Sequence, residues 1–209
     1  MEGRTLRLGG RAALTGGALV AADSRLVAQF AAELDVRDGR LWLSKAAGLG
    51  FNGPLSASGD LPLNWIEPYL PDGWRLEGVA ASPAPASFEA RAEPDVKALG
   101  TWLRPDEPGR ISGTLRLRAA GTATEPSLGA VDAVAIVEPD TVTVRDAAFT
   151  LAKPAEVRIK DGRARVDRAA LMAPGTTASV SGTFGLEGDR AIDVRLTASG
   201  ALGFLSSVV

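Results

Sequence analysis

The sequence predicts an all-β protein, built as one elongated, curled antiparallel sheet that forms a groove of repeated units with one or two short helices. Apolar and polar residues alternate with a period of two along much of the chain. Turn-forming residues interrupt these runs roughly every 8–12 residues. Amphipathic helical patterns are few and short. These three observations together favour β-structure over any helical class.

Alternation gives each predicted strand one apolar face and one polar face. In residues 155–160, Val157 and Ile159 alternate with charged residues. The same pattern recurs at 113–119, 141–145 and 191–197. Because successive side chains of a strand point to opposite faces, one polar face per strand is typical of an antiparallel sheet.

Two dipeptides predict tight hairpins. Asp38-Gly39 and Asp161-Gly162 each lie between alternating segments. Asp-Gly favours a two-residue hairpin turn because glycine adopts a positive φ without steric cost. Residues 138–140 and 173–175 combine proline with aspartate or glycine, and they predict two further breaks.

The sequence predicts helices in two segments. Residues 63–70 can form one or two turns, limited by Pro68. Residues 95–103 carry apolar residues at helical spacing, with Asp95 as the expected N-cap and Pro105 beyond the end.

The chain repeats itself over an interval of 123 residues. Residues 36–40 match residues 159–163 at this offset. Residues 55–63 match residues 178–186 at the same offset. The repetition predicts a stack of similar β-units. Two similar hairpins within one sandwich remain the alternative.

We expect two segments in the chain. Residues 1–94 would form a β-repeat segment with a short helix near 63–70. Residues 95–209 would form a helix followed by a second β-groove segment. The last residues resemble the start of another such helix, so we expect the chain to be a fragment of a longer protein.

Composition excludes several function classes. The chain contains no Cys and no His, so it lacks disulfides, thiolate metal sites and histidine-based catalysis. Lys and Arg total 23 against 25 Asp and Glu, which argues against a nucleic-acid partner. No apolar run reaches the roughly 20 residues of a membrane-spanning helix, and no signal peptide is visible.

Polar clusters in the sequence have simple structural interpretations. The basic cluster in residues 158–168 is interrupted by Asp161 and Asp167, as in a solvated strand face. The glycine-rich residues 48–53 lack the lysine and the strand–helix context of a phosphate loop. We therefore expect no catalytic residue, no cofactor and no metal, and we expect that the protein is not an enzyme.

A one-sided sheet with few helices must bury its apolar face in another way. A second sheet could cover it, or the sheet could curl and leave a groove for an apolar ligand. Lipid acyl chains suit such a groove because they need apolar area and no specific polar partner. The candidate groove residues are the alternating apolar ones: Leu115, Leu117, Val142, Val144, Val157, Ile159, Val180, Phe184, Ile192, Val194 and Leu196.

Several motifs occur in a characteristic order. A glycine-bounded strand at 109–115 precedes Gly-Thr-Ala-Thr-Glu-Pro-Ser-Leu at 121–128. An Asp-Gly hairpin at 157–163 and a Ser-Gly strand at 178–186 follow. This order resembles the TamB family (translocation and assembly module) within the AsmA-like group.

The resemblance covers residues 95–209, and residues 31–63 fit as another copy. It implies a taco-shaped β-groove that crosses the periplasm of a diderm bacterium, held in the inner membrane by an N-terminal anchor missing from this chain. It implies phospholipid acyl chains as cargo, carried between the inner and outer membranes. It also implies outer-membrane protein assembly and secretion with a TamA-like barrel partner.

Two alternatives differ from lipid transport. A scaffold for outer-membrane proteins would pair its open sheet edges with client β-strands. An extracellular β-sandwich would serve binding or adhesion. Aromatic residues make up only 5% of the chain, which argues against a sugar-binding face.

Overall fold

The computed structural model describes residues 4–21, 24–79, 84–103, 111–144, 147–186 and 191–200. Within these ranges fourteen strands form one sheet, and β1 and β6 form a separate parallel pair. The predicted all-β fold with short helices is confirmed. The elements are β1 (Arg4–Leu6), β2 (Gly10–Ala21), β3 (Ser24–Arg37), β4 (Arg40–Gly50), β5 (Gly53–Pro62), η1 (Leu63–Trp65), η2 (Glu67–Tyr69), β6 (Trp74–Leu76), β7 (Ala86–Ala92), α1 (Val96–Leu103), β8 (Ile111–Gly113), β9 (Leu117–Ala123), η3 (Leu128–Ala130), β10 (Val131–Val137), β11 (Thr141–Val144), β12 (Ala147–Leu151), β13 (Ala155–Lys160), β14 (Arg163–Ala173), β15 (Thr176–Gly185) and β16 (Ile192–Gly200).

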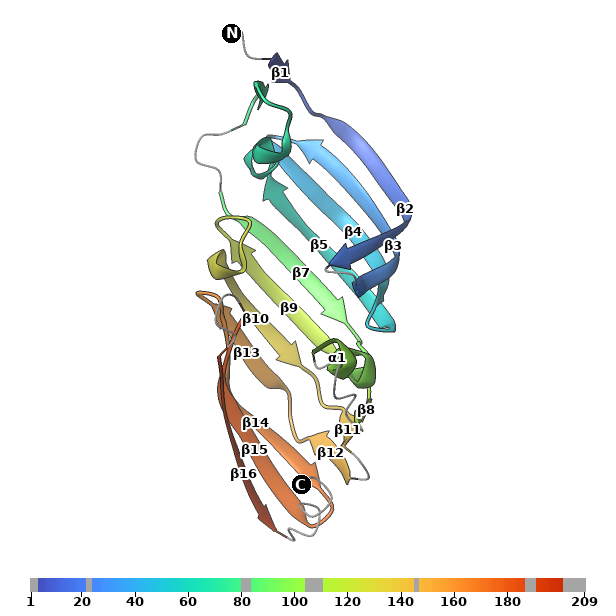
Figure 1. Ribbon diagram of the computed structural model, residues 1–209, viewed down its shortest axis with the longest axis vertical. Coiled ribbons are helices and arrows are strands. Elements are labelled where there is room, and N and C mark those ends of the chain that lie inside the picture. Colours follow the sequence, from blue (N-terminus) through green and yellow to red (C-terminus); the bar gives the residue numbers. More distant parts are fainter. Residues whose placement is uncertain are drawn as a thin grey trace.

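The large sheet is long and forks at β14. Antiparallel pairing runs through β2, β3, β4, β5, β7, β9, β10, β13, β14, β15 and β16 (Figure 1). The first half of β14 pairs with β13, where Val166 lies opposite Val157. The second half pairs with β12, where Leu171 lies opposite Leu151. The branch continues from β12 through β11 to β8, so it lies at one end of the sheet.

Both predicted Asp-Gly hairpins are confirmed. Asp38 and Gly39 have φ angles of 53° and 69°, and they join β3 to β4. Asp161 and Gly162 have φ angles of 50° and 67°, and they join β13 to β14. Two successive positive φ angles are the signature of a turn whose twist matches that of the flanking strands.

The helices follow the sequence pattern closely. Residues 63–70 form two short 3₁₀ helices, η1 and η2. Helix α1 begins at Val96, and the Ala98 amide donates a hydrogen bond to Asp95 Oδ1 at 2.9 Å. Asp95 is therefore the N-cap, as predicted.

The 123-residue repeat extends to structural details. The β4–β5 pair shifts register between Leu43 and Ala46, and the β14–β15 pair shifts between Val166 and Ala169, 123 residues later. Gly59 and Gly182 occupy matching positions, with φ angles of 157° and 153°. The two units join one continuous sheet, because β7 pairs with both β5 and β9.

The buried apolar residues are mostly small. Seven of the eleven buried hydrophobic residues in the described ranges are alanines, among them Ala46, Ala133 and Ala178. Two sheets packed face to face bury large side chains between them, in a core about 10 Å thick. Burial of alanines alongside half-buried large residues instead fits a single curled sheet.

Candidate functional site: an apolar groove

Cross-strand register places apolar residues on one face of the sheet from β2 to β16, which we call the inner face. Two unbroken rows of register partners cross eleven strands, and every member is apolar or glycine. One row holds Ala12, Leu34, Leu43, Gly59, Phe88, Gly121, Ala133, Ile159, Ala164, Phe184 and Ile192. The other holds Leu14, Ala32, Ala46, Ala57, Ala90, Ala119, Ala135, Val157, Val166, Gly182 and Val194.

A cavity of about 450 Å³ opens on the inner face beside the fork. Fourteen of its sixteen lining residues are apolar, and the other two are Glu138 and Asp140. The apolar lining consists of Leu115, Val137, Val142, Phe149, Leu151, Ala155, Val157, Val166, Ala169, Leu171, Ala178, Val180, Leu196 and Ala198. We call this cavity the apolar groove. Its composition and volume match those of pockets that bind apolar ligands.

A β-bulge in β14 lets both halves of that strand contribute to the apolar groove. Register shifts between Val166 and Ala169, so Asp167 and Arg168 supply the extra residue. Without the shift, Val166 and Ala169 would point to opposite faces. With it, both line the groove, and the strand bends at the point where the sheet forks.

The two acidic residues at the groove are neutralised by arginines. Arg118 Nε lies 2.8 Å from Glu138 Oε1. Arg116 Nε lies 3.3 Å from Asp140 Oδ2, and Arg116 Nη2 donates a hydrogen bond to the Pro139 carbonyl at 3.1 Å. The edge of the groove therefore carries balanced charge, while its wall is apolar.

The predicted groove residues divide into three groups. Leu115, Val142, Val157, Val180 and Leu196 come together in the apolar groove. Leu117, Ile159, Phe184 and Val194 share inner-face register positions with apolar partners, outside the groove lining. Val144 and Ile192 pair with Ala147 and Phe184, and their side chains lie outside the described part of the structure.

Sequence reasoning missed several groove residues. Phe149 and Leu151 lie on β12, where alternation covers too few residues to stand out. Leu171 lies beyond the bulge, where the period of two has shifted. The adjacent charges Asp167 and Arg168, placed between apolar residues, were the available signal for this shift.

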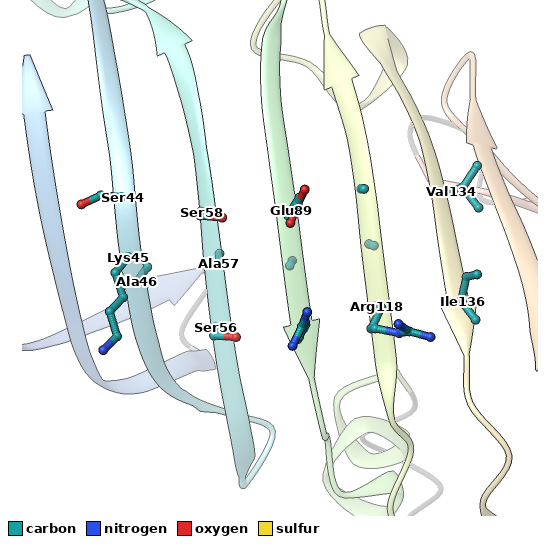
Figure 2. Close-up of a pocket in the computed structure, with 14 residues that line it drawn as sticks. Ser44, Lys45, Ala46, Ser56, Ala57, Ser58, Glu89, Arg118, Val134 and Ile136 are labelled. Carbon is teal, nitrogen blue, oxygen red and sulfur yellow. The ribbon is translucent and has the colours of Figure 1, made fainter. Parts of the chain in front are cut away.

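The opposite face of the sheet, which we call the polar face, carries charged and hydroxyl side chains among apolar ones. A hollow of about 580 Å³ on this face spans β4, β5, β7, β9 and β10. Figure 2 shows the side chains that line it. Ser58, Glu89 and Arg118 line it together with the apolar Val134 and Ile136. This mixture of hydroxyl, charged and apolar groups favours no single class of ligand.

Exposed ion pairs lie on the polar face near the groove. Arg158 Nε donates a hydrogen bond to Glu156 Oε1 at 2.7 Å, and this bond raises the pKa of Arg158. Both side chains are well exposed, so the pair contributes little to stability.

The described residues lack the features of two other kinds of site. They contain no group of three or more acidic residues placed to hold a metal ion. None of their helices has the length and apolar character needed to cross a bilayer.

Comparison of the chain with protein-family models, with curated proteins and with solved structures gives no significant match. The apolar groove is therefore the feature that bears most directly on function.

Proposed function

We propose that this chain is a segment of a groove that carries phospholipid acyl chains between the inner and outer membranes of a cell envelope. The observation that carries the proposal is the apolar groove, with fourteen apolar residues around about 450 Å³. Burial of an acyl chain there stabilises the complex by roughly 25 cal/mol for each Å² of apolar area removed from water. It requires no polar partner, and the lining offers almost none.

The two apolar rows extend this argument beyond the groove. They continue the same face from β16 to β2 without a charged residue. A track of this kind suits cargo that moves, because no single position holds it by specific contacts. The sequence resemblance adds the periplasmic setting, an inner-membrane anchor and an outer-membrane assembly partner to the proposal.

An exposed apolar side chain in the groove wall also favours an apolar ligand. Leu196 lines the groove and is 59% exposed. Val194, on the same face of β16, is 54% exposed, and adjoining apolar side chains left in water are typical of a binding surface. A bound acyl chain would cover the Leu196 side chain.

Val157→Asp should weaken binding of a dansyl-labelled long-chain fatty acid by at least about thirtyfold, as measured by fluorescence titration. Val157 lines the groove, and a carboxylate there loses water without gaining a partner, at a cost of about 2 kcal/mol or more. The matched control is Val134→Asp, in the adjacent strand. Val134 lies on the polar face, 40% exposed, and its register partner is Arg158. The control should bind the probe as the unaltered protein does.

A second variant separates loss of binding from loss of folding. Val142→Trp adds apolar volume to the half-buried groove wall and introduces no charge. It should reduce probe binding while circular dichroism still reports the β-fold. Equal binding by Val157→Asp, Val142→Trp and Val134→Asp would contradict the proposal.

A further inference from the structure

Among the strands that the structure describes, β16 forms an open edge of the sheet. In the described part of the chain, β16 pairs with β15 alone (Figure 1). All nine of its residues keep one register with β15, so the edge is regular. The other edges are less suited to pairing. Pairing of β2 shifts register three times, and β8 has three residues.

The backbone groups of β16 that point outward can be assigned. The Gly185 amide donates a hydrogen bond to the Ala191 carbonyl at 3.0 Å. Ala191 therefore faces β15, and so do Asp193 and Arg195, because hydrogen-bonding direction alternates along a strand. The amides and carbonyls of Val194 and Leu196 point to the open edge.

The open edge lacks the usual protection against pairing. Natural edges are blocked by an inward charge, a proline or a bulge. In β16 the inner-face residues Val194 and Leu196 are apolar and 54% and 59% exposed, and the strand contains no proline. Charges occupy the other face, at Asp193 and Arg195.

We propose that β16 pairs antiparallel with β16 of a second copy of this chain, in the register that places Val194 opposite Val194. This register places Asp193 opposite Arg195 of the second copy, and Arg195 opposite its Asp193. Leu196 then lies opposite the position of Ile192. Opposite charges meet on the polar face, and apolar positions meet on the inner face.

Neighbouring registers are poorer. Moving the two-fold axis by one residue sets Arg195 against Arg195 or Asp193 against Asp193, and like charges directly opposite destabilise a strand pair. Moving it to Leu196 leaves Arg195 opposite Thr197. Among these registers, only the one centred on Val194 forms both charged pairs and also uses the backbone groups that point outward.

The proposed interface joins two apolar faces. A two-fold axis perpendicular to the sheet keeps both inner faces on the same side. Leu196, in the groove wall of each copy, would then lie next to the seam. The pairing rests on the edge of β16, and it holds whether or not the groove binds acyl chains.

Single cysteines test the register, because the chain has no other cysteine. Val194→Cys should form a disulfide-linked dimer under mild oxidation, since paired Cα atoms in a sheet lie within disulfide reach. Leu196→Cys should form far less, because the two copies of residue 196 would be about 13 Å apart along the strands. Preferential linking through Leu196→Cys, or equal linking through both, would overturn the register.

Charge variants of the full chain test the interface by sedimentation equilibrium. Asp193→Arg should raise the dimer dissociation constant about tenfold, because both charged pairs become repulsive. Adding Arg195→Asp to it should restore the original value. Both variants should keep the β-sheet signal in circular dichroism. A monomeric unaltered protein, or one that captures an added β-strand peptide and not its own copy, would overturn the proposal.

Discussion

Gly182→Ala is expected to lower the free energy of unfolding by about 2–4 kcal/mol and to loosen β16 from β15. A Cβ at position 182 would lie 2.1 Å from the Asp193 carbonyl oxygen of β16. The φ angle of 153° adds strain for any residue with a side chain. Backbone strain and overpacking each cost about 1–3 kcal/mol, and here they act together. Chemical denaturation measures the loss.

A second glycine provides the control. Gly16 in β2 also has a positive φ, 70°, but a Cβ there would meet no atom within 4 Å. Gly16→Ala should therefore cost only the strain, about 1 kcal/mol. Hydrogen exchange should show faster exchange along β15 and β16 in Gly182→Ala alone. Equal destabilisation by the two variants would mean that β16 does not approach β15 as closely as described.

Arg40→Met is expected to destabilise the protein by about 3–5 kcal/mol. Arg40 pairs with Asp60, whose side chain is 8% exposed, and Arg40 also donates hydrogen bonds to the carbonyls of Ala84 and Pro85 at 2.9 and 2.8 Å. Ser87 Oγ also contacts the Asp60 carboxylate. Removing the guanidinium leaves a buried carboxylate with one hydroxyl partner, which is the costly case for a buried ion pair.

The double variant Arg40→Met with Asp60→Asn also removes the charge of the Asp60 carboxylate, which Arg40→Met leaves without its arginine partner. It should recover a large part of the lost stability, because burying an amide costs much less free energy than burying a carboxylate. Arg158→Met is the control, since the Arg158–Glu156 pair is exposed and contributes little to stability. Equal losses in Arg40→Met and Arg158→Met would show that Asp60 remains solvated.

Local features of the fold were predictable from the sequence because their causes are local. The Asp161-Gly162 turn depends on the φ preference of two residues. The start of α1 depends on the capping oxygen of Asp95. The inner face of β13 follows from alternation at Val157 and Ile159, since the period of a strand is set by its own backbone.

Position along a strand was not predictable in the same way. Ile159 and Phe184 lie on the predicted face, but near the Asp161-Gly162 end of their strands, away from the fork. Val157 and Val180 lie nearer the fork and line the apolar groove. A period of two assigns a face, whereas membership of a groove depends on where distant strands bend.

The fork itself arises from long-range pairing. The second half of β14 pairs with β12, beyond the bulge that Asp167 and Arg168 form in the β14–β15 pair. A bulge is defined by two residues on one strand opposing one on its partner. The register shift depends on β15 as well as on β14, so the sequence of β14 alone does not define it.

Photo-crosslinking at four consecutive residues tests the lipid groove most directly. A photoreactive amino acid is placed in turn at positions 157, 158, 159 and 160, and the protein is mixed with vesicles of phosphatidylcholine. Val157 lines the groove and Ile159 shares its face, whereas Arg158 and Lys160 are exposed on the other face. We expect strong labelling of lipid from 157, weaker labelling from 159, and none above background from 158 and 160. Equal labelling at all four positions, or labelling confined to 158 and 160, would contradict the proposal that the apolar groove binds lipid.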